Sequence, residues 1–146
     1  MRAYGQRYKE CVPSELFGDF EAVFEANFPD RVKEVKAAKT VPVDGGIFFI
    51  IKFTTSPSSV NGFVESFPEK ELLLEWAQYG VESDRRRSSG FWRPPKWFIE
   101  PIEEGKVARY HPAYGDVHIY IDSSDKKASV VYIYGWFIKS YAKRKS

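Results

Sequence analysis

An almost unbroken apolar run at residues 47–53 places the strongest constraint on the fold, because such a run is typical of a central strand covered on both faces. The tripeptide Asp44-Gly45-Gly46 before it tolerates the positive φ values of a tight turn. The segment that precedes this turn is polar with interspersed β-branched residues. Together these features predict a hairpin with strands at 33–42 and 46–54.

A second hairpin is predicted toward the C-terminal end. Apolar and polar residues alternate from Val117 to Asp122, which is the period of a strand with one buried face. A turn at 123–126 separates this segment from another strand that runs from Ala128 to about Phe137. Cross-strand pairing would gather tyrosines of this hairpin, namely Tyr120, Tyr132 and Tyr134, on one face.

Three helices are expected between and before the hairpins. The first begins with Ser14 as its N-cap and ends at Pro29. The second has Ser56 as its N-cap and Pro57 in the first helical position, and a short third helix ends at Gly80. Their apolar residues recur at helical steps: Leu16, Phe17, Phe20, Val23, Phe24 and Phe28; Val60, Phe63, Val64 and Phe67; Leu72, Leu73, Trp76 and Tyr79.

The expected fold class is α+β, with a four-stranded, mainly antiparallel sheet built from the two hairpins and helices packed on one face. A chain of 146 residues fits one domain. We expect an N-terminal arm at 1–12, a single domain at 13–138 and a basic tail at 139–146. The core is expected to be aromatic, since 12 Phe, 9 Tyr and 4 Trp stand against a single Met.

The charges nearly cancel, with 22 Lys and Arg against 20 Asp and Glu, so the chain lacks the basic excess usual in a dedicated nucleic-acid domain. Cys11 is the single cysteine, which excludes an internal disulfide. The first ten residues have no apolar region typical of a signal peptide, and no apolar run is long enough to span a bilayer. The expected location is therefore the cytoplasm.

No established catalytic or cofactor motif is present, so no cofactor, metal ligand or catalytic residue is predicted. A structural zinc site needs more Cys and His residues than the chain contains. A metal site formed by Asp116, His111 and His118 is supported only by the two-residue spacing of Asp116 and His118. The enzyme best supplied with residues is a metal-free nuclease or other hydrolase. It would use His111 and His118 as acid and base, with Arg109 or Lys106 holding phosphate.

The segment 81–115 is the irregular third of the chain, and its string at 85–98 interleaves aromatic rings with cations. Trp and Arg are favoured where a protein partner binds, while rings and cations together also suit stacking on a single-stranded nucleic acid. Alternatively, the same rings have a structural role and pack the loop against the sheet. The leading hypothesis is a small binding or inhibitory protein that recognises a protein partner, as some bacterial or phage proteins do, with single-stranded nucleic-acid binding or the hydrolase as alternatives. The predicted partner-binding residues are Arg85, Arg86, Arg87, Trp92, Arg93, Lys96, Trp97, Tyr120, Tyr132 and Tyr134.

Overall fold

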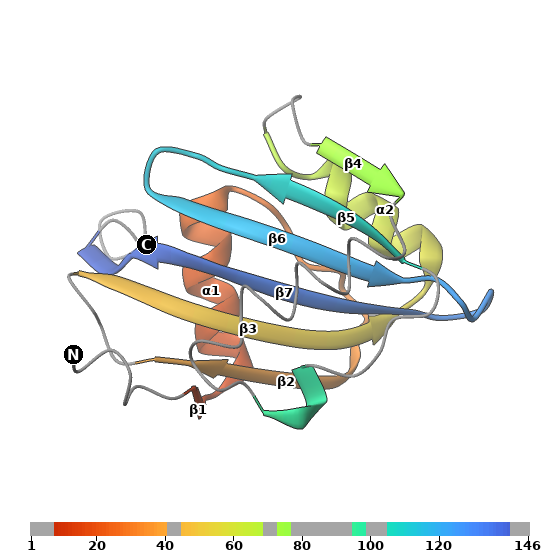
Figure 1. Ribbon diagram of the computed structural model, residues 1–146, viewed down its shortest axis with the longest axis horizontal. Helices are drawn as coiled ribbons and strands as arrows, with labels where there is room; N and C mark the ends of the chain where they lie inside the picture. The colour runs from red at the N-terminus through yellow and green to blue at the C-terminus, as the bar shows by residue number, and fades with distance from the viewer. Residues whose placement is uncertain (1–7, 41–44, 69–72, 77–94, 99–104, 141–146) are drawn as a thin grey trace.

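A computed structural model describes residues 8–40, 45–68, 73–76, 95–98 and 105–140 (Figure 1). The elements in chain order are β1 (Lys9–Glu10), α1 (Pro13–Phe24), β2 (Lys33–Lys39), β3 (Gly46–Thr55), α2 (Pro57–Glu65), β4 (Leu73–Trp76), the 3-10 helix η2 (Lys96–Phe98), β5 (Gly105–Tyr110), β6 (Gly115–Asp122) and β7 (Ser129–Ile138).

The strands form one sheet in the order β1-β2-β3-β7-β6-β5-β4, and every neighbouring pair is antiparallel. Both predicted hairpins are confirmed as β2–β3 and β6–β7. The two hairpins join through β3 and β7, the long strands at the centre, where Ile50 lies opposite Tyr134. The α+β class and the antiparallel sheet are therefore confirmed.

The predicted number of strands is wrong, because the described part of the chain contains seven rather than four. Strand β5 lies inside the segment predicted to be irregular, and β4 replaces part of the predicted third helix. A short apolar run does not distinguish helix from strand by its period alone. Pairing of Leu74 with Ala108 across β4 and β5 shows that tertiary contacts decided the outcome. The remainder of that predicted helix lies outside the described residues.

The helix boundaries match the prediction closely for α2 and poorly for α1. Ser56 caps α2 by accepting a hydrogen bond from the Ser59 N–H at 3.2 Å, as predicted. Helix α1 begins two residues earlier than predicted, because the N-cap is Val12, which has no side-chain cap, rather than Ser14. It ends at Phe24 rather than at Pro29, because Glu25 adopts φ 56° and its N–H bonds back to the Glu21 carbonyl. Among the helices that the structure describes, none combines the length and apolar composition that crossing a bilayer requires.

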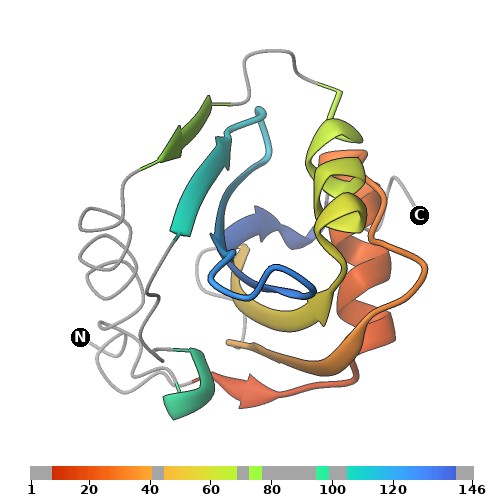
Figure 2. The same ribbon diagram turned by 90° about the vertical axis from the view of Figure 1, so that its right-hand side faces the viewer.

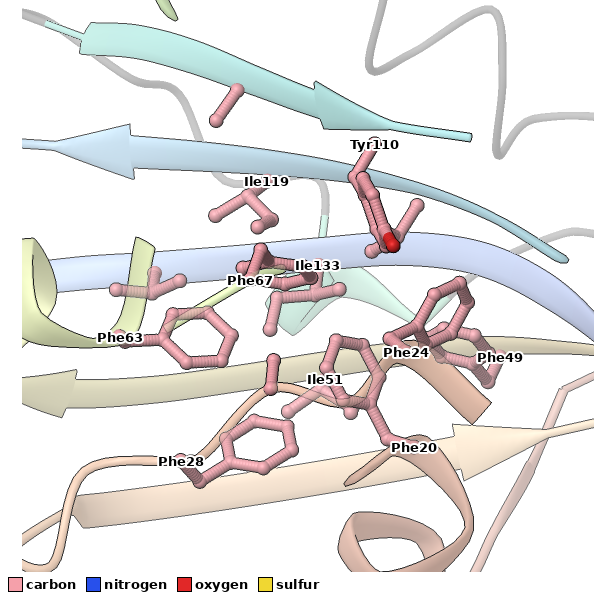
Figure 3. Packing of buried hydrophobic residues seen from close by; sticks show 14 of the residues in the cluster. Phe20, Phe24, Phe28, Phe49, Ile51, Phe63, Phe67, Tyr110, Ile119 and Ile133 are labelled. Carbon is pink, nitrogen blue, oxygen red and sulfur yellow. The ribbon is translucent and has the colours of Figure 1, made fainter. Parts of the chain in front are cut away.

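Phenylalanine rings from both helices and from β3 form the main core. Figure 2 shows α1 and α2 on the same side of the sheet, and Figure 3 shows their rings meeting over β3 and β7. Phe20 meets Phe49 edge-on with ring centroids 5.7 Å apart, and Phe63 contacts Phe53 at 6.1 Å. Phe28 lies beyond the end of α1 and stacks on Phe63 at 5.0 Å. This first face of the sheet is covered by a cluster of buried apolar and aromatic side chains.

The second face of the sheet carries a smaller cluster that includes tyrosines. Its buried members are Ala38, Ile50, Phe98, Val107, Tyr120 and Tyr132, and its half-buried members are Tyr8, Trp97, Val130 and Tyr134. Phe98 brings η2 onto this face by contacting the Tyr132 ring at 6.1 Å. The side chains of Tyr120 and Tyr132 pair across β6 and β7 as predicted, but they are 0% and 3% exposed. In this conformation they pack the sheet and present no open platform.

Candidate functional site: a histidine-aspartate cluster

The predicted partner-binding residues fall into three groups. Arg85, Arg86, Arg87, Trp92 and Arg93 lie outside the described residues. The structure gathers Trp97 with the three tyrosines in the cluster on the second face, and leaves Lys96 exposed beside them on η2. The indole Nε1 of Trp97 and the hydroxyl of Tyr8 are buried, and neither has a hydrogen-bond partner within the part of the chain that the structure describes. The described members of the predicted set, Lys96, Trp97 and the three tyrosines, therefore form a packed layer with one exposed cation rather than an exposed aromatic surface.

The residues with the clearest chemistry meet at the beginning of β6. Asp116 and His118 are two positions apart on that strand, so their side chains lie on the same face. The short connection from β5 brings His111 to the same carboxylate. Asp116 Oδ1 lies 3.4 Å from His111 Nδ1, and Asp116 Oδ2 lies 3.3 Å from His118 Nε2. One carboxylate thus bridges both histidines of the chain.

The environment keeps the Asp116 carboxylate charged. Burial, the largest influence, acts to raise its pKa, but the hydrogen bonds and charges of His118 and His111 outweigh burial and hold the pKa below the usual value. The side chain of Asp116 is 27% exposed, whereas those of His118 and His111 are 18% and 72% exposed. The cluster therefore has an inner histidine, a shared anion and an outer histidine that meets solvent.

The inner histidine is fixed from several sides. Its Nδ1 lies 3.4 Å from the Tyr120 hydroxyl, and the ring meets that of Tyr134 edge-on at 6.0 Å. The strand register also places Arg109 of β5 directly opposite His118. Since β-sheet partners share a face, the Arg109 side chain belongs to the same side of the sheet as the cluster.

This arrangement suits proton transfer by the outer histidine. When Nδ1 of an imidazole faces a carboxylate, the ring is oriented and its Nε2 is left to accept a proton. Nε2 of His111 has no partner among the described residues. Within those same residues, no group of three or more His, Cys, Asp or Glu side chains has the arrangement to hold a metal ion.

The single cysteine of the chain is poorly suited to nucleophilic attack. Cys11 is half-buried and its backbone N–H bonds to the Ala37 carbonyl beside β2. Burial raises the pKa of the Cys11 thiol, Lys39 opposes this effect, and Glu15 and Glu10 add to it. A thiol held in its neutral form is a poor nucleophile.

Comparison of the chain with models of protein families, with curated proteins and with solved structures gave no match to any of them. The assignment of a site therefore depends on the geometry of the residues. The sequence named His111, His118 and Asp116, but it did not reveal that Asp116 stands between the two histidines. The signal that was present is the alternation of 116, 118 and 120 along one strand.

Proposed function

We propose that the protein is a metal-independent ribonuclease that cleaves RNA by transesterification, with His111 as general base. The observation that carries the proposal is the shared Asp116 carboxylate, which lies within 3.4 Å of Nδ1 of the exposed His111 and is itself anchored by His118 at 3.3 Å. A general base needs an orienting partner and an accessible nitrogen, and His111 has both.

The described residues include a general base but no activated nucleophile. A substrate that carries its own nucleophile is therefore favoured. In RNA the ribose hydroxyl beside the phosphodiester can attack the phosphorus. His111 Nε2 takes the proton of that hydroxyl, and the bond from phosphorus to the leaving ribose oxygen breaks. The leaving oxygen takes a proton from water, and the resulting hydroxide takes the proton back from His111, which restores the base. The product then carries a cyclic phosphate. The guanidinium of Arg109, on the same face as His118, adds positive charge where negative charge develops.

The test uses a fluorescent RNA oligonucleotide in the presence of EDTA, with the cyclic phosphate end detected by mass spectrometry. His111→Gln should lower the rate by about 10²–10⁴-fold, the usual contribution of a general base. Asp116→Asn should also lower it, because the amide holds the ring without the charge. Asp30→Asn serves as the matched control, since Asp30 is exposed and lies outside the cluster.

The same oligonucleotide made of DNA lacks the attacking hydroxyl and should remain intact. An RNA substrate left uncleaved by the wild-type protein, or cleaved equally by His111→Gln, would show that the cluster has a structural role only.

Recognition of a protein partner through 85–98 is a second proposal. It is supported by the exposed Lys96 next to the half-buried Trp97 on η2. A stoichiometric partner recovered with the wild-type chain and lost with Lys96→Glu would support it. Salt-sensitive binding of single-stranded oligonucleotides by the same face would instead favour the nucleic-acid alternative.

A further inference from the structure

A cavity of about 370 Å³ lies at the end of the sheet opposite to the histidine-aspartate cluster. It is formed where β3 runs into α2, where the chain enters β2, and where the β6–β7 turn enters β7. The lining residues are Arg31, Lys33, Thr54, Thr55, Ser56, Ser59, Lys127 and Ala128. Segments far apart in the sequence thus bring three cations and four hydroxyl groups to one space, and none of the lining residues is acidic.

The three cations of this cavity are not neutralised by neighbouring acids. Within the described part of the chain, Arg31, Lys33 and Lys127 have no ion-pair partner, and all three are exposed. Like charges that converge without a counter-charge repel one another, and this repulsion is relieved when an anion binds between them. The unbalanced charge therefore favours an anionic occupant.

The walls of the cavity are held by hydrogen bonds. The Thr55 hydroxyl, on a side chain that is 7% exposed, donates to the Arg31 carbonyl at 2.6 Å and so ties the approach to β2 to the end of β3. The hydroxyls of Ser56 and Ser59 are 2.9 Å apart, and Ser56 also accepts the Ser59 N–H. The hydroxyl groups are therefore positioned before any ligand arrives.

A β-bulge directs Lys33 toward this cavity. Lys36 pairs with Lys52, yet Lys33 pairs with Thr54, so β2 has one residue more than β3 over this interval. Side chains three positions apart on a regular strand point to opposite faces, but the extra residue returns Lys33 to the face of Thr54. The bulge includes Glu34 at φ 52°, a left-handed conformation that disfavours any residue with a Cβ. The strained residue of the bulge thus lies next to Lys33, where the bulge sets the direction of the lysine side chain.

We propose that the cavity binds the phosphate group of a small phosphomonoester. Three cations suit a dianionic group. The hydroxyls of Thr54 and Ser59 can donate to its oxygens, since those of Thr55 and Ser56 already donate within the cavity walls. A volume of about 370 Å³ falls within the usual size of small-molecule sites and leaves room for an organic group beside the phosphate. The proposal is independent of the ribonuclease proposal, because the two sites share no residue.

The test is an NMR titration of the ¹⁵N-labelled full chain with glycerol phosphate at constant ionic strength, with inorganic phosphate and with sulfate as separate arms. Saturable shifts should centre on the amides of Ser56, Ser59 and Lys127. Glycerol phosphate should bind more tightly than inorganic phosphate, and sulfate should bind least. Equal affinity for all three anions would overturn the phosphomonoester proposal in favour of unspecific anion binding.

Charge-matched double variants separate the cavity from the general positive charge of the surface. Lys33→Gln with Lys127→Gln should weaken binding by at least about tenfold, since hydrogen bonds to charged groups are lost. Lys36→Gln with Lys126→Gln removes the same charge from exposed neighbours outside the cavity and should leave the affinity unchanged. The spectra also report whether each variant is folded. Equal affinity of the two double variants, or shifts spread over all basic residues, would refute the site.

Discussion

Gly135 offers a sharp test of the strand packing beneath the histidine-aspartate cluster. It lies on β7 between Phe49 of β3 and Val117 of β6. A Cβ added to Gly135 would overlap the backbone carbonyl oxygen of Asp116, and would stand 3.0 Å from Phe49 Cζ and 3.1 Å from Val117 Cα. Two of these three neighbours are backbone atoms of a paired strand, so they cannot swing aside as a flexible side chain would.

The expected cost of Gly135→Ala follows from this geometry. Overpacking a core costs about 1–3 kcal/mol and occasionally more, while replacing glycine recovers about 0.4–1 kcal/mol by restricting the unfolded chain. Because strand backbone must move, we expect a cost at the top of the first range and a net loss of about 2–3 kcal/mol. For a domain of this size that corresponds to a fall in Tm of about 4–12 °C.

The assay is urea denaturation followed by tryptophan fluorescence, with Gly18→Ala as the control. Gly18 is an exposed residue within α1, and a Cβ there would meet nothing within 4 Å. That variant should gain about 0.5–1 kcal/mol, because alanine is the better helix former. Equal stability of Gly135→Ala and the wild-type protein would refute the close approach of β7 to the Asp116 backbone. The reported β6–β7 register would then be wrong.

Three further changes have distinct expected outcomes. The depressed pKa of Asp116 means that its stabilising contribution is present above about pH 4 and is lost as the pH falls through its folded-state pKa. Acid titration of stability should therefore be steeper for the wild-type protein than for Asp116→Asn. Tyr8→Phe removes a buried hydroxyl that has no partner among the described residues, and it should raise stability by about 1 kcal/mol. Burial, with Tyr134 adding to it, raises the pKa of Tyr8, so the wild-type protein should also lose stability above about pH 10 more steeply than this variant. Glu34→Gly should gain about 0.5–1 kcal/mol in urea denaturation by relieving the positive φ.

The parts of the fold that the sequence predicted are those whose signals are local. Gly45, at φ 82°, and the run at 47–53 belong to one hairpin, and both signals are short-range patterns, whereas Asp44 of the predicted turn lies outside the described residues. The start of α2 was equally readable, because an N-cap serine followed by proline acts through its own backbone. The missed strands β4 and β5 depend on each other and on β6 for their hydrogen bonds. Their own residues carry little strand signal, so only the completed sheet edge specifies them.

The candidate site likewise has features that local sequence patterns predicted and features that they did not. Alternation along β6 was enough to place Asp116 and His118 on one face. The approach of His111 depends on how the connection from β5 turns back, which no spacing rule describes. The opposite cavity was harder still, since Lys127 lies far from Arg31 and Lys33 in the sequence and Lys33 reaches the cavity through a bulge. A bulge is set by register, and register emerges only when both strands are paired.

The two polar sites lie at opposite ends of the same sheet, and the middle of the sheet between them is filled by packed side chains. Ile50, Tyr132 and Tyr120 are buried across the second face, and the first face is covered by phenylalanine. Asp116 pairs with Trp136 of β7, which pairs with Phe48 of β3, so Phe48 marks the level of the cluster on β3. Thr54, further along β3, lines the cavity. At about 3.3 Å per residue, the two sites are therefore separated along β3 by about 20 Å. Substitutions at that separation are additive unless the packed centre transmits a change. A double-mutant cycle with Asp116→Asn and Lys127→Gln should therefore give additive effects on stability. A coupling beyond about 0.5 kcal/mol would show that the tyrosine layer links the two ends.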